Sequence, residues 1–356
     1  MAIRPPPGRV SKGRQKRLLE KRIVLSPDAK SSVFIRREKY ANEMRVPMKQ
    51  STLTRPAKRR HSQLERNKIR AGTVFIIPAL VLCLLFMVYP LIEVIRYSFT
   101  DWNGIAKDYG YVGFNNYKEI TKIDGFKDMM IATGTYAVGV TVLVIFISFI
   151  TALALDKKGK GRINRGFLRS LWFLPALLSG TVVGMLWRIM YNYHNGVINK
   201  TLASIGIEKI NWLETRGITN LAIIIGSTWA HIGFCVIVFL AGLQSIPQDL
   251  YEAASLDGAK PRQQLWNVTM PLMAPSITIN VITTTIAGFK AYELPYNISM
   301  GLPGKSTLLI TQRINFFGFQ DFDFGLGSAL SVILLIIIAC ISLIQLVYLK
   351  KREEVY

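Results

Sequence analysis

The sequence predicts an all-α fold: a polytopic membrane protein with six transmembrane helices and both termini in the cytoplasm. Half of its 356 residues are hydrophobic, and the mean hydropathy is +0.29. About 20 apolar residues cross a bilayer core of about 30 Å, and the chain contains six apolar runs of about that length. These runs lie at about residues 74–95, 129–155, 167–190, 221–243, 276–298 and 326–349.

Charge differs between the segments that join these runs, and this difference predicts the orientation. Residues 1–70 hold 21 Lys and Arg against 5 Asp and Glu, which is 16 of the 22 net positive charges. Segment 156–170 carries six basic residues against one acidic, and 350–352 is Lys-Lys-Arg. Segments 96–128 and 191–219 are balanced or nearly so. Because short basic segments stay in the cytoplasm, we expect the tail, the second and fourth connections and the C-terminus to lie inside.

The basic tail, residues 1–70, precedes a membrane domain that we expect to cover residues 71–356. The tail is polar, and Phe34 and Tyr40 are its only aromatic residues, so it is predicted to be largely disordered. We interpret it as a solvated cytoplasmic tail that helps to fix the topology, with contact to anionic lipid head groups or RNA as the alternative. Basic residues interleaved with aromatic ones are typical of nucleic-acid binding, so no nucleic-acid partner is expected.

Polar and small residues within the runs indicate a packed bundle. Gly180 and Gly184, four apart in the third run, predict a close approach of two helices within one subunit. His231 lies in the fourth run, and Lys290 and Glu293 lie in the fifth. Charged residues in a span usually face a bundle interior or a water-filled path. A substrate path is therefore our hypothesis, and the three-residue spacing would let Lys290 and Glu293 pair along one helix face. The alternative is simple packing, with both residues in the outer part of the span and the lysine extending to the interface.

The sequence argues against an enzyme. Gly301–Thr307 ends in Gly-Lys-Ser-Thr like a phosphate-binding loop, but Ser299 occupies the position of its first glycine. A strand should precede such a loop and a helix should follow it, whereas this stretch joins two spans. His61, His194 and His231 show no zinc-binding spacing. We therefore expect no cofactor, no metal and no catalytic residue in this chain.

Two further patterns have ordinary interpretations. Cys83, Cys235 and Cys340 all lie inside apolar runs, so they are best understood as small hydrophobic residues. Asn199-Lys200-Thr201 matches a glycosylation acceptor, a pattern that is common by chance.

Residues 248–271 are too polar to span a membrane, yet they are patterned. Ser245 and Gln248 have the spacing of a capping box. Gly258 is suited to a chain that leaves a helix in a left-handed conformation. Pro261 is suited to the first position of a second helix, and Pro271 is expected to break the chain again. The residues at helical spacing in the first part are Leu250, Ala253, Ala254 and Asp257. The stretch is predicted to be a helix, a glycine bend and a second helix at the cytoplasmic membrane surface.

This stretch resembles a family signature. It is similar to the EAA motif, which begins here with Glu252-Ala253-Ala254 and, after three residues, has Gly258. After nine more residues the motif closes with Val268-Thr269-Met270-Pro271. That motif marks the membrane subunits of binding-protein-dependent ABC importers. Val268 and Met270 stand where the family has Ile and Leu, both conservative changes. The flanking 246–251 and 256–259 are similar to the carbohydrate branch of the family.

The resemblance extends over about residues 71–356 and leaves out the basic tail. Four short stretches resemble the first permease of maltose- and glycerol-phosphate-type systems. They are Ile77-Pro78-Ala79, Tyr89-Pro90, Ser98-Phe99-Thr100 and Gly113–Tyr117. In the last outer turn the family tends to have Thr, Gly-Gly-Pro and a downstream Thr. Here Ser299, Gly301-Leu302-Pro303 and Thr307 stand at these positions, so Leu302 replaces one glycine.

The resemblance implies a permease subunit in the cytoplasmic membrane of a prokaryote. Its implied partners are a second homologous permease, two cytoplasmic ATPase subunits that bind ATP and Mg²⁺, an extracytoplasmic solute-binding protein, membrane lipids and a carbohydrate substrate. It also implies that the EAA loop docks on the ATPase and that ATP-driven movement of this loop rocks the spans between outward- and inward-facing states. The coupling residues carried over are Glu252, Ala253, Ala254, Asp257 and Gly258.

The family's cavity is lined by the spans before and after this loop. Counted from the motif, the substrate-path candidates are Ser227, His231, Phe234, Thr284, Gly288 and Ala291. Aromatic, hydroxyl and imidazole groups suit a sugar. The alternatives are the same architecture carrying a non-sugar solute such as a polyol phosphate, a secondary transporter or channel without an ATPase, and a membrane-anchored scaffold for the basic tail.

Overall fold

The computed structural model describes residues 63–156, 165–302, 304 and 307–353. The chain divides into two units, Met1–Ile77 and Pro78–Tyr356, and of the first unit only the start of helix α2 is described. Residues 1–62 of the predicted tail and 157–164 of the predicted basic connection lie outside the described residues. Helix α2 begins at Gln63, so helical structure starts before the predicted domain boundary at residue 71.

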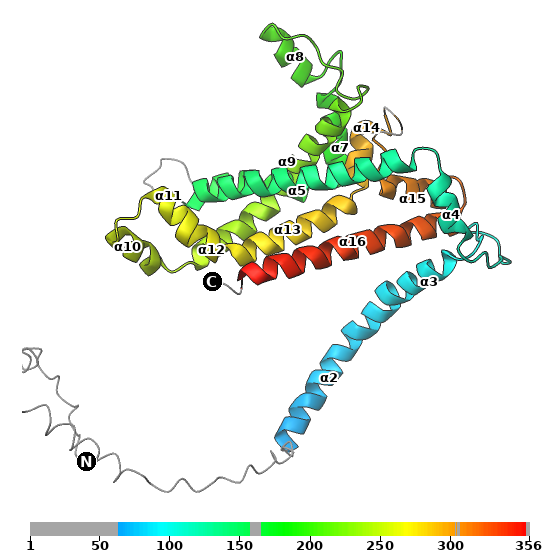
Figure 1. The fold of residues 1–356 in the computed structure, drawn as a ribbon, viewed down its shortest axis with the longest axis horizontal. Helices are drawn as coiled ribbons and strands as arrows, with labels where there is room; N and C mark the ends of the chain where they lie inside the picture. The colour runs from blue at the N-terminus through cyan, green and yellow to red at the C-terminus, as the bar shows by residue number, and fades with distance from the viewer. Residues whose placement is uncertain (1–62, 157–164, 303, 305–306, 354–356) are drawn as a thin grey trace, which may run out of the picture. The chain divides into compact units, whose positions relative to one another are not determined.

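All regular elements in the described part of the chain are helices, as the sequence predicts (Figure 1). An isolated β-bridge joins Thr100 to Tyr111. The helices, with η marking 3₁₀ or π turns, are α2 (Gln63–Cys83), η1 (Leu84–Val88), α3 (Tyr89–Tyr97), α4 (Asn115–Lys122), α5 (Phe126–Asp156), α6 (Arg165–Phe173), η2 (Leu174–Leu177), α7 (Gly180–Met190), α8 (Val197–Ser204), α9 (Ile218–Ser245), α10 (Gln248–Leu256), α11 (Pro261–Gln264), η3 (Leu265–Thr269), α12 (Met270–Leu272), α13 (Ala274–Phe289), α14 (Glu293–Ser299), α15 (Ile310–Phe319) and α16 (Phe324–Glu353).

Among the described residues, four helical stretches are long and apolar enough to cross a membrane unbroken. They are Gly72–Tyr97, Phe126–Asp156, Ile218–Ser245 and Phe324–Lys351. Two further candidates are bent pairs of helices, so the number of spans is four to six. The third predicted run is bent by 98° between η2 and α7, and the pair Pro261–Leu272 and Ala274–Phe289 is bent by 65°. The fifth predicted run is also interrupted, because α13 ends at Phe289 and α14 begins at Glu293.

Two π turns each end two residues before a proline, and the prolines explain them. Pro90 follows the turn Leu84–Val88, and Pro271 follows the turn Leu265–Thr269. Proline has no amide hydrogen to bond the carbonyl four residues earlier, and its ring crowds that carbonyl. A local widening of the helix relieves this conflict without ending the helix.

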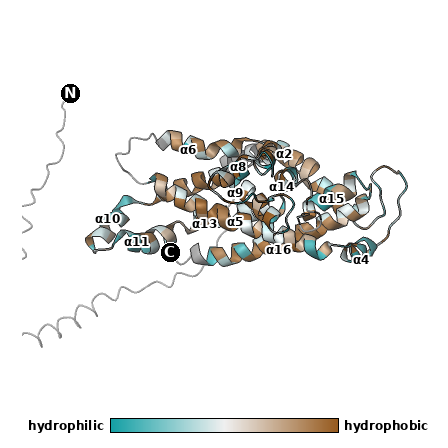
Figure 2. Cartoon of the chain, turned by 90° about the horizontal axis from the view of Figure 1, so that it is seen from above, coloured by the Kyte–Doolittle hydropathy of each residue, from teal (hydrophilic) through white to brown (hydrophobic). Residues whose placement is uncertain are grey.

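Helix α9 is the centre of the bundle. The most apolar window of α9 is 61% buried, against 28% for α5 and 11% for α16. In Figures 1 and 2, α5, α9, α13 and α16 run alongside one another. Residues from α5, α7, α9 and α14 form one apolar cluster that includes Val144, Val183 and Ile298. Another cluster joins the ends of α5 and α9 to Met273.

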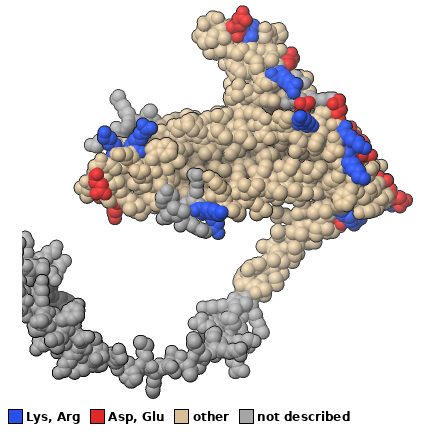
Figure 3. All heavy atoms as spheres, in the orientation of Figure 1, with Lys and Arg blue, Asp and Glu red and all other residues tan. Residues whose placement is uncertain are grey.

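The surface of the helices has the distribution expected of a membrane protein. Apolar residues dominate the long helices, whereas hydrophilic residues gather on α4 and α10 (Figure 2). Figure 3 shows charged side chains around α10 and α11, around α4, near α8 and at the C-terminal end of α16, with a largely uncharged flank between them. Large apolar side chains such as Phe146 and Ile344 are 63% and 69% exposed, which indicates that lipid or another subunit covers them.

Candidate functional site

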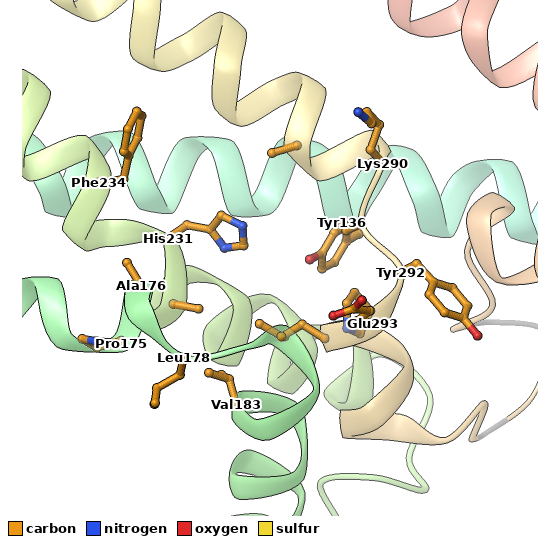
Figure 4. A pocket seen from close by; sticks show the side chains of 16 residues that line it. Tyr136, Pro175, Ala176, Leu178, Val183, His231, Phe234, Lys290, Tyr292 and Glu293 are labelled. Atoms are coloured by element: carbon orange, nitrogen blue, oxygen red, sulfur yellow. The ribbon is translucent and has the colours of Figure 1, made fainter. Parts of the chain in front are cut away.

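A cavity of about 520 Å³ lies where the two interrupted spans meet α5 and α9. Four regions supply its walls: α5, the bend from η2 into α7, the middle of α9, and the break between α13 and α14 (Figure 4). The lining residues are Tyr136, Pro175, Ala176, Leu178, Gly180, Val183, Ala230, His231, Phe234, Ala287, Lys290, Ala291, Tyr292, Glu293, Leu294 and Pro295.

The first break is built by local sequence. Pro175 cannot continue the hydrogen-bonding of α6, and the chain passes through the 3₁₀ turn Leu174–Leu177. Ser179 is extended and caps α7 by accepting a hydrogen bond from the amide of Val182 at 3.3 Å. The bend therefore turns the start of α7 toward the cavity.

Helix α7 packs closely on α14 through the two glycines that the sequence analysis singled out. A Cβ on Gly184 would lie 2.6 Å from Cβ of Asn297 and 3.0 Å from the carbonyl oxygen of Leu294. A Cβ on Gly180 would lie 3.3 Å from Oε2 of Glu293. The prediction of a close helix approach within one subunit is confirmed, and this approach holds Glu293 against the start of α7.

The second break separates the two charged residues of the cavity. Lys290 caps the end of α13, its amide donating to the carbonyl of Ile286 at 3.1 Å, and Glu293 is the first residue of α14. The predicted pairing along one helix face is therefore wrong, because the helix ends between them. Neither side chain makes an ion pair in the described part of the chain, and the ammonium of Lys290 points away from Glu293 in Figure 4.

His231 is oriented by its own helix. Its Nδ1 lies 2.7 Å from the carbonyl oxygen of Ser227. A carbonyl oxygen only accepts, so Nδ1 carries the hydrogen. In the neutral imidazole, Nε2 is then a bare acceptor. The hydroxyl of Tyr136 donates to Oγ of Ser227 at 3.0 Å, which ties α5 to the same turn of α9.

The structure brings some of the predicted substrate-path residues to the cavity and excludes others. His231, Phe234 and Ala291 line it. Ser227 is fully buried beneath Tyr136. Thr284 lies 3.5 Å from Sγ of Cys235, between α13 and α9.

Gly288, another predicted path residue, also lies between helices. A Cβ on Gly288 would lie 3.0 Å from Cα of Ala137. Gly288, like Ser227 and Thr284, thus packs helices together. These residues lie close to the cavity wall without forming it.

Sequence reasoning missed two parts of the lining. Tyr136 lies within an unbroken apolar helix whose residues are mostly alike, so nothing in the sequence distinguishes it. The η2–α7 bend had a signal, because Pro175 and Gly180 stand five residues apart inside the third apolar run. Hydropathy averaged over a window does not register such a break.

The stretch 248–271 forms a closed unit. Helix α10 ends at Leu256, Gly258 adopts φ +80°, and Pro261 opens α11 as predicted. Nε2 of Gln264 donates to Oγ of Ser255 at 2.9 Å and to the carbonyl of Ala259 at 3.2 Å, which joins the two helices across the bend. The hydroxyl groups of Tyr251 and Thr269 lie 3.0 Å apart.

The predicted capping box at Ser245 is wrong. Ser245 is the last residue of α9, and its hydroxyl donates to the carbonyl of Gly242 at 2.7 Å. Pro247 occupies the cap position of α10 and has no side-chain hydrogen bond there. The helix begins where predicted, but its first turn is set by the proline.

One face of this unit is exposed to solvent and presents both charge and apolar surface. Glu252, Ala253, Asp257 and Gly258 are exposed, and Ala254 is half-buried. Leu250 lies on the same helix and is 42% exposed. The face thus combines small apolar side chains with two carboxylates and has no partner among the described residues.

Two other sequence patterns are explained by their surroundings. Gly301 follows α14, a helix and not a strand, so the Gly301–Thr307 turn lacks the context of a phosphate-binding loop; Pro303, Lys305 and Ser306 lie outside the described residues. Asn199 is fully buried. Its Nδ2 donates to the carbonyls of Tyr193 and Ile210, and its Oδ1 accepts from the amide of Ile210 and from Nε1 of Trp212. Its side chain is therefore structural. No cluster of metal-ligating side chains occurs within the described ranges.

These features define a polytopic helical membrane protein with an internal cavity at two helix breaks and a folded polar unit between two spans. Residues 145–353 match the family model described as binding-protein-dependent transport system inner membrane component. The chain belongs to this family, whose members are transport permeases and not enzymes.

Two relatives align with this chain over almost their whole length. The probable permease AmyD of a starch-degradation-product transport system in Thermoanaerobacterium thermosulfurigenes is 32% identical, over 79% of this chain and 94% of its own. The permease MsmF of a multiple sugar-binding transport system in Streptococcus mutans is 33% identical, over 79% and 96%. A chain of a bacterial ABC transporter that imports the acidic polysaccharide alginate has the same fold, with a TM-score of 0.71 at 20% identity over 82% of this chain and 99% of that one.

Proposed function

We propose that this chain is the permease subunit of an ATP-driven importer that carries a sugar across the cytoplasmic membrane of a prokaryote. The observation that carries the proposal is the closed unit 248–271, with its exposed face of Glu252, Ala253 and Asp257. A unit joined internally by Gln264 moves as one piece. It is therefore suited to transmit movement from a separate ATPase into α9 and α13, which flank it.

The roles of the individual residues follow from this arrangement. Ala253 and Ala254 provide the small apolar surface that enters a cleft of the ATPase, while Glu252 and Asp257 provide polar contacts at its rim. Gly258 makes the bend that lets the two helices fold together. ATP and Mg²⁺ bind to two ATPase subunits and not to this chain.

The assembly contains further partners. A second homologous permease covers the apolar flanks, a solute-binding protein delivers the sugar from outside, and membrane lipids cover the remainder. The sugar-transport names of AmyD and MsmF support this substrate class, and one solved relative is an alginate transporter in complex with a pentasaccharide-bound periplasmic protein. We propose six spans, two of them bent, with both termini in the cytoplasm.

The substrate path runs through the cavity between α9 and α13–α14. His231, Phe234 and Ala291 form part of its wall, and Ser227, Thr284 and Gly288 support the helices behind that wall. One observation favours a polyol phosphate as the alternative solute, namely the ammonium group of Lys290 at the cavity.

Uptake by the reconstituted importer tests the proposal. The chain is purified with its partner permease and ATPases, placed in liposomes, and supplied with the binding protein and a panel of labelled neutral oligosaccharides. We expect uptake of at least one sugar that requires ATP on the ATPase side. Uptake that persists without the ATPase subunits would instead support a secondary transporter.

The basic tail is tested in the same assay. Because we propose that residues 1–70 fix topology, deletion of residues 2–60 is expected to leave the uptake rate per correctly inserted transporter unchanged. Lost uptake by correctly inserted protein would assign the tail a direct role.

A further inference from the structure

The hydrogen-bonding groups around the cavity are mainly acceptors without a donor. Glu293 and His231 line it from opposite walls, one at the start of α14 and the other in the middle of α9. In Figure 4 both side chains point into the open space between the helices. Within the described residues, the carboxylate of Glu293 and Nε2 of His231 have no hydrogen-bond partner.

The available donors are mostly committed elsewhere. The hydroxyl of Tyr136 donates to Ser227 at 3.0 Å, and that of Tyr292 donates to Asn315 at 3.0 Å. The remaining donor is Lys290, which is exposed and whose ammonium points away from Glu293. Among the described side chains that line the cavity, none therefore directs a free donor into the space between His231 and Glu293.

Glu293 packs against the start of α7. Gly180 has no side chain, and its absence leaves room for the carboxylate, which would otherwise lie 3.3 Å from a Cβ there. The contact of Gly184 with Asn297 holds the rest of α14 against α7. Glu293 lines the cavity, so a solute that fills the cavity lies beside its side chain.

We propose that Glu293 and His231 form a specificity-determining pair that selects uncharged, hydroxyl-rich solutes and rejects solutes with phosphate or carboxylate groups. Hydroxyl groups donate to the carboxylate and to Nε2, and the bond to the carboxylate is the stronger one because its acceptor is charged. A phosphate or carboxylate group brings no donor to these two acceptors and is repelled by the negative charge of Glu293. Lys290 does not reverse this preference, because its ammonium points away from Glu293 in Figure 4.

This inference rests on the proposed function, since it concerns the substrate class of the same cavity. The inference favours a neutral sugar over a polyol phosphate as the solute, a choice that the architecture alone leaves open. It also assigns the discrimination to this chain and not only to the solute-binding protein.

The binding preference of the cavity is measured by saturation-transfer NMR on the whole importer in lipid nanodiscs, without the binding protein. The neutral probes are maltotriose, raffinose and xylotriose, and the anionic probe is trigalacturonate, a trisaccharide with a carboxylate on each ring. For the wild type we expect at least one neutral probe to bind about tenfold more tightly than trigalacturonate, the factor that corresponds to one charge-assisted hydrogen bond.

Substitution of Glu293 reverses the preference. Glu293→Gln keeps the shape and removes the charge, so we expect weaker binding of the neutral probe and tighter binding of trigalacturonate, each by about tenfold. Glu208→Gln, an exposed glutamate in the segment between α8 and α9, is the matched control and leaves both unchanged. Should Glu293→Gln not fold, Glu293→Asp shortens the carboxylate and is expected to weaken binding of the neutral probe alone.

Three results would overturn the inference. One is equal binding of trigalacturonate and the neutral probes by the wild type, and another is no effect of Glu293→Gln on either class. The third is the absence of saturation for every neutral probe. ATP-dependent sugar uptake is measured on the same preparation: if uptake is intact while one of these results is found, only the inference fails, and if no sugar is taken up, the proposed function fails as well.

Discussion

Substitution of Gly184 by Ala tests the packing that holds the cavity together. The new Cβ would lie 2.6 Å from Cβ of Asn297 and 3.0 Å from the backbone oxygen of Leu294, whereas carbon atoms pack at about 3.5–4.0 Å. Helix α14 must therefore move by about 1 Å, and part of the obstruction is backbone, which no side-chain rotation relieves. Overpacking of this kind costs about 1–3 kcal/mol.

A matched substitution separates this cost from the general effect of replacing glycine. Gly134 lies in α5, and a Cβ there would meet nothing within 4 Å. Gly134→Ala is expected to stabilise the protein by about 0.5–1 kcal/mol, because alanine favours a helix. Gly184→Ala gains the same propensity, so the difference between the two variants isolates the contact of α7 with α14.

Thermal unfolding of the purified chain in detergent, followed by tryptophan fluorescence, measures this difference. We expect Gly184→Ala to unfold at a lower temperature than Gly134→Ala by the equivalent of about 1–3 kcal/mol, and sugar uptake to fall only in the Gly184 variant because Glu293 moves with α14. Equal unfolding temperatures for the two variants would refute the close packing of α7 on α14.

Three further substitutions probe other parts of the account. Tyr136→Phe removes the donor to Ser227 and is expected to lower the free energy of unfolding by about 1 kcal/mol, measured by the same thermal assay; no change would show that this bond is not formed. Asn199→Ala leaves several buried backbone groups without partners, at about 1–3 kcal/mol for each, so segment 191–217 is expected to be cut faster by trypsin, and an unchanged cleavage rate would contradict its structural role. Gly258→Ala places a side chain at φ +80°, which costs about 1–2 kcal/mol and is expected to weaken ATPase co-purification; undiminished recovery of the ATPase would count against the bend.

The sequence predicted the helical class and the positions of the apolar helices because both depend on local composition. Runs of about 20 apolar residues have few alternatives to a membrane helix, and four of the predicted runs are unbroken helices. The breaks at Ser179 and after Phe289 escaped prediction, since mean hydropathy remains high on both sides of each. Pro175 marks the first break, whereas the three-residue spacing of Lys290 and Glu293 predicts one continuous helix across the second break.

The candidate site was predictable where a backbone rule applied and less so where tertiary contacts decide. Gly258 has the left-handed conformation expected of a glycine after a helix, and Gly184 makes the close approach expected of its spacing. Counting along α9 and α13 located the right helices, but it could not tell the wall residue His231 from the buried Ser227 one turn earlier. That distinction depends on Tyr136 from α5, which covers Ser227.

Coupling through the unit 248–271 is the central claim, and Glu252→Lys in the complete importer tests it most directly. The substitution reverses a charge on the exposed face of α10, and Glu208→Lys is the control because Glu208 is an exposed glutamate outside this unit. ATPase co-purification and ATP-driven sugar uptake are measured for correctly inserted protein. We expect Glu252→Lys to lose both and Glu208→Lys to keep both, and full retention of both by Glu252→Lys would contradict coupling through this unit.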